Sequence, residues 1–342
     1  MRPIVFNPAS DDSFRLSQSW LQTCLQTHEK CPHPRGDFKP TRVIEIQRVE
    51  AKFTLRLLET LSKTTEPYVA LSYCWGGEGH VKTTSKDIGQ RLSGIDINDL
   101  PATIKDAILL TERLGIRQLW VDALCIIQDD DKDKTSEIIQ MPLIYSQATV
   151  TIIASRASSV QEGFLHGRTP WNSDTNKAFE LPYKCISGET ESVLLHRMIE
   201  EATEPLDYRA WALQERILSP RILEYGSLQT RWVCCHNIPP VSGVTDGFKA
   251  VSIYNEERWD YLFTIALQAI LNITDITDLD PTHPEHPPTQ WHNLVRVYTH
   301  RKLTEPTDRI PAITGIASRF GRILRDDYCA GLWKSNLVKE LL

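Results

Sequence analysis

The feature that most constrains the fold is an alternation of apolar runs and amphipathic stretches in the middle of the chain. Three apolar runs of strand length lie at 68–73, 117–122 and 149–154. The two stretches between them carry apolar side chains at helical spacing, at 101–114 and 135–146. Pro101 suits the first turn of its helix, and Gly115 suits its end. Strands joined by short helical connections are parallel, so this pattern predicts an α/β domain with a sheet covered on both faces.

The segments on either side predict additions to this core. Leu16, Trp20 and Cys24 lie at i, i+4 spacing ahead of a run of prolines, which predicts a helical lead, and 41–49 predicts a strand. Downstream, the pattern predicts a helix, a hairpin and three further helices, at 209–218, 222–234, 259–271, 291–302 and 311–324. We therefore expect three parts: an N-terminal lead, an α/β core and a mostly helical C-terminal extension, at 1–65, 66–215 and 216–342.

Composition and charge exclude several classes of protein. A chain of 342 residues with 41% hydrophobic residues and a net charge of −6 is too apolar and too weakly charged to be disordered. The acidic balance argues against a nucleic-acid partner. No apolar run approaches the roughly 18 residues that cross a bilayer, and no secretory signal is visible. We expect a cytoplasmic protein without a membrane span.

Cysteine and histidine residues gather near the N-terminus. Cys24, His28 and Cys31 form the pattern Cys-x3-His-x2-Cys, and these are side chains that bind zinc. A fourth ligand would come from His33, Cys234, Cys235 or His236. The spacing matches no standard zinc finger, and buried, reduced cysteines account for the same pattern. A structural zinc ion and a metal-free packing role both stay open.

The carboxyl ends of the predicted strands are where we expect a ligand to bind. The first strand runs into Tyr73, Trp75 and Gly76, and the two aromatic rings can stack on a nicotinamide or adenine ring or anchor the turn. The glycines at 76–79 lack the spacing and the lysine of a phosphate-binding P-loop. This turn is therefore a candidate for contact with a small molecule, and weak evidence for a phosphate site.

The second strand leads into further polar candidates. Asp122 can contact a ligand or cap the turn that follows it. Cys125 can act as a nucleophile, with His80 or His166 as its base, or pack as a small buried side chain. Gln128 can pair with a carboxamide or with backbone groups. The acidic run at 129–133 lacks the glycine and glutamate of an EF-hand, so we expect a solvated loop there.

Three longer motifs resemble the fungal heterokaryon incompatibility (HET) domain. They are Tyr-Val-Ala-Leu-Ser-Tyr-Cys-Trp-Gly, Leu-Trp-Val-Asp-Ala-Leu-Cys-Ile-Ile-Gln and Arg-Ala-Trp-Ala-Leu-Gln-Glu-Arg, at 68–76, 119–128 and 209–216. Segments at 308–317 and 328–333 are similar to the usual C-terminal extension of that family. The resemblance implies an effector of fungal non-self recognition and programmed cell death that self-associates. It also implies a TIR/flavodoxin-like parallel-sheet core, and several TIR domains hydrolyse NAD with a catalytic glutamate.

The resemblance directs attention to the glutamates. Glu137 would hydrogen-bond a ribose diol and stabilise an oxocarbenium-like transition state, or it is a helix-start carboxylate near a Thr135 or Ser136 cap. Glu162, after the third strand, is a rival. Trp211 and Glu215 share one helix face, which predicts a clamp onto the core, with Glu215 able to reach the site. The candidate catalytic residues are Glu137, Asp122 and Cys125, and the candidate substrate-binding residues are Tyr73, Trp75, Gly76, Gln128, Trp211 and Glu215.

Three functions stay open at this point. The first is an NAD hydrolase that acts in cell death, with NAD as its substrate. The second is a signalling module without catalytic activity, in which the same surface recruits partners. The third is a repurposed enzyme that acts on a small molecule in a biosynthetic pathway.

Overall fold

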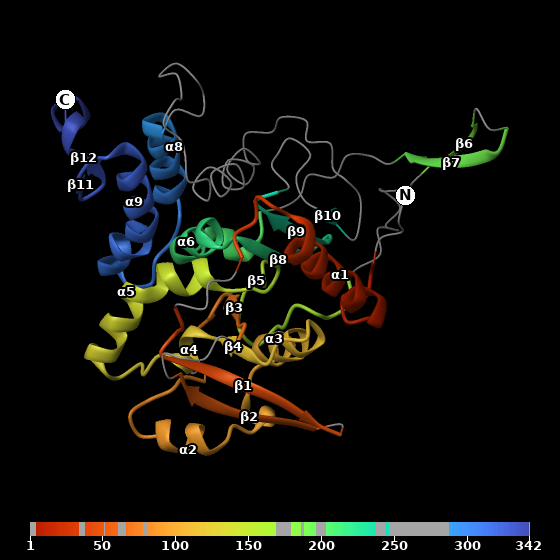
Figure 1. Ribbon diagram of the computed structural model, residues 1–342, viewed down its shortest axis with the longest axis horizontal. Helices are drawn as coiled ribbons and strands as arrows, with labels where there is room; N and C mark the ends of the chain where they lie inside the picture. Colours follow the sequence, from red (N-terminus) through yellow and green to blue (C-terminus); the bar gives the residue numbers. More distant parts are fainter. Residues whose placement is uncertain are drawn as a thin grey trace.

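The computed structural model, shown in Figure 1, describes residues 5–33, 38–50, 52–60, 66–77, 81–168, 179–185, 188–195, 203–236, 244–245 and 287–341. Within these residues an eight-stranded sheet has the order β10-β9-β8-β5-β3-β4-β1-β2. Its strands are β1 (Arg42–Val49), β2 (Lys52–Glu59), β3 (Val69–Ser72), β4 (Gln118–Trp120), β5 (Val150–Ile153), β8 (Arg221–Tyr225), β9 (Thr230–Cys234) and β10 (Val244–Thr245).

The four central strands of this sheet are parallel. β3 pairs with both β4 and β5, and β5 pairs with β8. Counted along the chain, these four strands lie in the order second, first, third, fourth, which is how the doubly wound flavodoxin-like sheet begins. The predicted α/β fold is confirmed. The winding reverses between β3 and β5, and that reversal is where such sheets bind ligands beyond the strand ends.

Antiparallel strands extend the sheet at both edges, so the sheet is mixed where the sequence pattern predicted parallel strands. The β1–β2 hairpin pairs with β4, and the β8–β9 hairpin carries β10. Toward their shared turn, β1 and β2 become exposed to solvent, which antiparallel edge strands tolerate. The predicted strand at 41–49 and the hairpin at 222–234 are both confirmed, whereas the predicted helix at 259–271 lies outside the described residues. One sheet thus takes strands from the expected lead, core and extension.

Helices cover both faces of the sheet. The longer ones are α1 (Asp11–Thr27), α3 (Ala102–Arg113), α5 (Asp131–Gln147), α6 (Ala210–Leu218), α8 (Pro287–Thr299) and α9 (Pro311–Leu324). α1 contacts α3, whereas α5, α6 and α9 contact one another, and Figure 1 shows the two groups on opposite sides of the sheet. Right-handed crossovers that lead toward opposite edges place their helices on opposite faces, which accounts for this division. No helix among the described residues is long and apolar enough to cross a membrane.

Shorter elements complete the described part of the chain. They are α2 (Ile88–Ser93), α4 (Asp122–Cys125), α10 (Leu337–Leu341), the hairpin of β6 (Phe179–Lys184) and β7 (Thr190–Leu195), the pair β11 (Tyr328–Cys329) and β12 (Leu332–Trp333), and four 3-10 turns, η1 (Ile97–Asp99), η2 (Pro205–Tyr208), η3 (Pro306–Arg309) and η4 (Lys334–Asn336).

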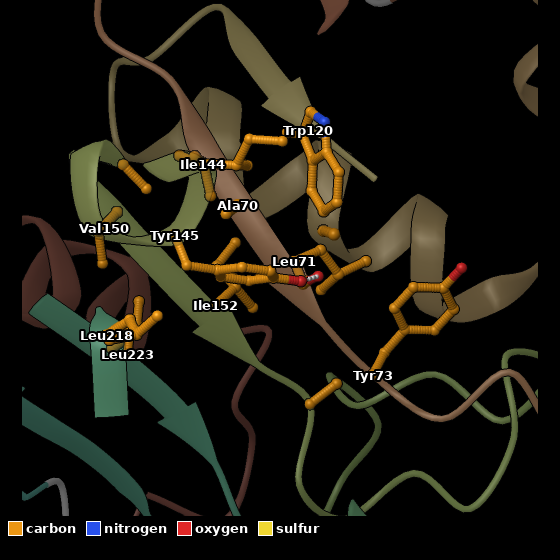
Figure 2. Close-up of a cluster of buried hydrophobic side chains, with 14 of the residues drawn as sticks. Ala70, Leu71, Tyr73, Trp120, Ile144, Tyr145, Val150, Ile152, Leu218 and Leu223 are labelled. Carbon is orange, nitrogen blue, oxygen red and sulfur yellow. Dashed lines mark hydrogen bonds between the residues drawn. The ribbon is translucent and has the colours of Figure 1, made fainter. Parts of the chain in front are cut away.

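Aromatic side chains fasten α5 to the sheet. Figure 2 shows Tyr145 lying across β3 among buried side chains from β4, β5 and β8. Its hydroxyl donates to the Leu71 carbonyl over 3.0 Å, and its ring meets that of Trp120 edge to face at 5.6 Å. These contacts bury large rings while satisfying the polar hydroxyl group. They fix the helix that precedes β5 against β3, the strand that leads into Tyr73.

The acidic run at 129–133 differs from the predicted solvated loop. α5 begins at Asp131, four residues before the predicted start, because the Asp130 side chain accepts hydrogen bonds from the backbone N–H groups of Lys132 and Asp133. Asp129 accepts from the backbone N–H of Ser85 over 2.7 Å. Glu137 therefore lies in the second turn of the helix, past the expected Thr135 or Ser136 cap.

Candidate active site at the carboxyl ends of the parallel strands

Asp122 is a partly exposed acidic residue at this edge of the sheet. It follows β4 as the first residue of α4, and its side chain is partly exposed. Oδ1 accepts from the backbone N–H of Ala123 over 2.7 Å, and Oδ2 accepts from Nε1 of Trp75 over 2.8 Å. Burial raises the pKa of Asp122, and the guanidinium of Arg209 opposes that shift. The residue is held in place by two donors while it still reaches solvent.

The turn after β3 brings Trp75 to Asp122. Gly76 has φ +83°, and a Cβ there would lie 2.6 Å from Cβ of Ser159, so the turn requires glycine. The Trp75 carbonyl accepts from the backbone N–H of Val160 over 3.3 Å. The loops after β3 and β5 therefore pack together where the winding of the sheet reverses. The indole N–H of Trp75 then bridges the ends of β3 and β4.

Glu215 is a second carboxyl in the same place, supplied by α6. It is buried, and Oγ of Ser72 donates to its Oε2. Burial raises the pKa of Glu215 to about 7, the hydrogen bond from Ser72 lowers it, and the nearby charge of Asp122 raises it. At neutral pH this carboxyl is therefore close to half protonated, which is the range in which a general acid or base works best.

Arg209 supplies positive charge beside the two carboxyls. Its Nη1 donates to the carbonyl of Tyr73 over 2.6 Å, and its charge lowers the pKa of both Asp122 and Glu215. The Tyr73 side chain is buried, and its pKa is raised by burial and by Asp122. Arg209 is part of the motif at 209–216, but the motif alone does not place it in the site. In the structure α6 packs against β3, and this brings Arg209 to Tyr73.

Gln128 stabilises the α4 turn through hydrogen bonds to the backbone. Its Nε2 donates to the carbonyl of Asp122 over 3.0 Å, and its backbone N–H donates to the carbonyl of Thr83. It therefore orders the α4 turn that positions the carboxylate. We call the residues that meet here the Asp122 group: Ser72, Tyr73, Trp75, Asp122, Arg209 and Glu215.

Glu137 belongs to different surroundings. It is buried, and burial raises its pKa, while Thr41 and Arg42 lower it. Arg42 itself pairs with Asp133 and donates from Nε to the carbonyl of Cys125 over 2.8 Å. Oε2 of Glu137 has no hydrogen-bond partner among the described residues. The charges that act on Glu137 thus differ from those that act on Asp122.

Cys125 has the environment of a packing residue. It is fully buried, and its Sγ accepts from the backbone N–H of Val121 over 3.4 Å. Burial raises its pKa to about 12, so the thiol is protonated at neutral pH, whereas nucleophilic cysteines have a lowered pKa. Of the two bases considered, His80 lies outside the described residues. His166 interacts with Arg156, Asp106 and Glu162.

Trp211 and Glu162 have their own partners. Nε1 of Trp211 donates to Oδ2 of Asp308 over 3.0 Å, which ties α6 to the C-terminal extension as a clamp. Glu162 is exposed and accepts from the backbone N–H and Oγ of Ser158 over 2.7 and 2.6 Å. These hydrogen bonds lower its pKa and order the turn after β5. Neither side chain joins the Asp122 group.

A second buried network of charged side chains, which no sequence motif predicted, lies next to this group. Arg216 contacts both carboxylate oxygens of Glu224 at 2.6 and 3.1 Å, and Ser155 donates to Glu224 over 2.6 Å. Burial raises the pKa of Glu224, but Arg216 more than offsets this, and the pKa falls to about 2. An acidic residue inside the predicted strand at 222–225 was the available signal.

The cysteine and histidine residues of the lead do come together. The ligand atoms of Cys24, His28, Cys31 and Cys234 all lie within 4.8 Å of one another. Nδ1 of His28 is 3.4 Å from Sγ of Cys234 and 3.9 Å from Sγ of Cys31. Among the candidates for a fourth ligand, the geometry selects Cys234. This cluster joins α1 to β9.

Comparison with protein families identifies a match to the middle of the chain. The family model described as "Heterokaryon incompatibility protein (HET)" matches residues 68–215. No curated protein and no solved structure matches the chain. The matched segment begins just before β3 and ends at Glu215, so it contains every member of the Asp122 group. It also contains the first two of the motifs, at 68–76 and 119–128, and most of the third.

Proposed function

We propose that residues 68–215, which match the family model of the heterokaryon incompatibility (HET) domain, form a HET domain that hydrolyses the bond between nicotinamide and ribose in NAD. The observation that supports this is the Asp122 group. Two carboxyls in unlike environments and one arginine meet at the carboxyl ends of parallel strands, beside the point where the winding reverses. The cell-death role follows from NAD depletion.

The proposed reaction divides the work between the two carboxyls. The bond between C1′ of the ribose and the nicotinamide nitrogen breaks, and nicotinamide leaves as a neutral molecule. Water adds to C1′ and releases one proton. Asp122, which reaches solvent, hydrogen-bonds the ribose hydroxyls and stabilises the positive charge that develops on the sugar. Glu215, with a pKa of about 7, accepts the proton from water.

The remaining members of the group suit the rest of the substrate. Arg209 offers positive charge for the diphosphate. The partly exposed Trp75 ring offers a face on which nicotinamide stacks. In this proposal Asp122 takes the role predicted for Glu137, and Glu215, expected from the sequence to bind substrate, accepts the proton from water. Glu137 is buried, and the charges that act on it come from Arg42 and Asp133 rather than from the Asp122 group.

The decisive experiment measures nicotinamide release when the purified full chain is incubated with NAD. We expect turnover by the wild type and a loss of at least about 100-fold in D122N and in E215Q, the usual size of an acid–base contribution. E137Q is the matched control, because it removes a buried carboxylate outside the group, and it should retain activity within a few-fold. A folded wild type that never consumes NAD contradicts the proposed function. Activity lost in E137Q but kept in E215Q contradicts the assignment of roles.

One observation favours a non-enzymatic signalling module as a second candidate. α5 exposes Ile139 and Leu143, one turn apart, with 72% and 49% of their surface accessible. Exposed apolar side chains at i, i+4 spacing are typical of helix contacts with another protein chain. In this alternative, the variant I139E/L143E abolishes self-association and toxicity, whereas D122N and E215Q leave both intact.

A further inference from the structure

We propose that Cys24, His28, Cys31 and Cys234 bind one zinc ion, which fastens α1 to β9. This site lies outside residues 68–215, and it is independent of the function proposed for the HET domain. Its role is structural, because four protein ligands close a tetrahedral zinc site and leave no position for a substrate.

The spacing of the ligand atoms fits a tetrahedral ion. Zinc binds sulfur at about 2.3 Å and nitrogen at about 2.0–2.1 Å, so neighbouring ligand atoms of a tetrahedron lie about 3.5–3.8 Å apart. Nδ1 of His28 lies 3.4 Å from Sγ of Cys234 and 3.9 Å from Sγ of Cys31. All four ligand atoms fall within 4.8 Å of one another. The protein alone already holds them at nearly the required distances.

Local backbone structure creates three of the four positions. α1 ends at Thr27, and the backbone N–H of His28 donates to the carbonyl of Cys24. The backbone N–H of Cys31 then donates to the carbonyl of His28 over 3.0 Å, so the chain turns back toward the helix end. Cys24 and Cys31 are thereby buried on the same side. The fourth ligand, Cys234, is the last residue of β9, a strand that α1 contacts.

Two side chains around the cluster support the four ligands: one stacks on the ligand histidine, and the other brings positive charge to the thiols. The ring of His236 stacks on His28 at 4.1 Å, which restricts the orientation of the ligand ring. Arg221 is buried, donates to the carbonyl of Pro32, and exerts its positive charge on Cys24. That charge suits a site in which three thiolates outweigh the two positive charges of zinc. Cys235, although adjacent to Cys234, donates to the carbonyl of Pro220.

The composition of the cluster favours a metal over a disulfide. The three thiols of the set can form one disulfide at most. The neighbouring thiol of Cys235 also interacts with Cys31, but disulfides that included it would still leave the His28 imidazole among the sulfur atoms without a bonding partner. Three cysteines and one histidine are, in contrast, a standard set for structural zinc. The two segments that meet here are separated by about two hundred residues, and a bound ion would also hold the lead against β9, the strand next to the edge strand β10.

The test is the metal content of the full chain, expressed in zinc-supplemented medium and purified with a reductant and without chelators. We expect about one zinc per chain by mass spectrometry of the metal. C234S and H28F should lower zinc affinity by well over tenfold, more than outer-shell changes do. H28C should keep zinc, since four cysteines also form a structural site. C185S is the matched control, because Cys185 is partly exposed on the loop between β6 and β7.

Cobalt provides a readout that does not depend on the folding of any variant. The wild type, stripped of zinc and reloaded with Co²⁺, should show thiolate-to-metal charge-transfer bands and the visible bands of tetrahedral cobalt. The proposal is wrong if the folded, reduced wild type holds no zinc and shows no cobalt bands. It is also wrong if C234S keeps full zinc affinity, or if the intact mass shows a disulfide among these cysteines in freshly purified protein.

Discussion

Two neighbouring residues of α6 enter opposite environments. Glu215 points to the end of β3, where it meets Ser72 and a second carboxyl, and its pKa rises to about 7. Arg216 points to β8, where it binds both oxygens of Glu224, whose pKa falls to about 2. In the first place Asp122 and Glu215 share the charge of Arg209. In the second, Glu224 has two arginines, Arg216 at 2.6 Å and Arg231 at 3.8 Å, while Asp207 lies 3.5 Å from Arg216. The ion pair of Glu224 with Arg216 holds that carboxylate in its charged form. Glu215, which lies near a second carboxyl, can gain or lose its proton near neutral pH.

The largest expected effect comes from breaking the paired side. R216M leaves Glu224 buried without its main partner, and we expect a loss of about 3–5 kcal/mol in the free energy of unfolding, measured by urea denaturation. R209M is the matched control on the unbalanced side, and it should cost about 1 kcal/mol or less, because Arg209 and Asp122 reach solvent. The double variant R216M/E224Q should recover most of the loss. Equal losses in R216M and R209M would contradict the contrast between the two sides.

The pH dependence of stability should have opposite signs on the two sides. The pKa of Glu215 is raised from 4.5, so its stabilising contribution is complete below about pH 4.5 and is lost as pH rises through about 7. The rise in the pKa of Glu215 from 4.5 to about 7 corresponds to about 3 kcal/mol of unfolding free energy. The pKa of Glu224 is lowered, so its contribution is present above about pH 4.5 and is lost as pH falls toward 2.

Glutamine variants separate these two windows. E215Q should remove the decline between about pH 4.5 and 7, and E224Q should remove the decline at lower pH, with unfolding followed in urea at each pH. If both variants flatten the same window, the two carboxyls do not differ as described.

A smaller effect is expected from the turn that aligns the two strand ends. G76A forces alanine into φ +83° and against Ser159, so we expect a loss of about 1–3 kcal/mol in unfolding free energy and reduced nicotinamide release. Gly77 is the control, since a Cβ there meets no atom within 4 Å. G77A should therefore change stability by less than about 1 kcal/mol. Comparable thermal midpoints for the two variants would show that the close approach to Ser159 is not required.

The smallest effect should come from one hydrogen bond within the Asp122 group. W75F removes the indole N–H that donates to Asp122, and we expect a cost of about 1 kcal/mol in stability. The pKa of Asp122 should rise as well, because its carboxylate loses a donor, and this can be followed by carbon NMR of labelled aspartate. An unchanged titration in W75F would mean that the indole does not stabilise the charged carboxylate.

Local patterns predicted the central elements of the fold and part of the site. Apolar runs placed β3, β4 and β5 correctly, and their carboxyl ends led directly to Trp75 and Asp122. At the edge of the sheet no strand was expected for β2, although Phe53, Leu55 and Leu57 alternate there with polar residues. The start of α5 was missed because Asp130 acts as an N-cap.

Contacts between distant segments account for the rest of the site. Arg209 reaches Tyr73 across about 130 residues of sequence, and Glu224 meets Ser155 across about 70, distances over which no periodicity gives a signal. The fourth member of the cysteine and histidine cluster was among four candidates for the same reason. Residue types suggested the ligand set, but choosing Cys234 required the position of β9 against α1.

The mixed sheet determines where this chain can be cut. Residues 68–215 hold β3, β4 and β5, while the strands that pair with the outer edges of β4 and β5 lie outside that range. A fragment with these limits would expose the backbone of two short, fully buried strands, each a template for pairing with another molecule. Such a fragment should aggregate on expression, whereas one that extends from β1 to β9 keeps both edges covered.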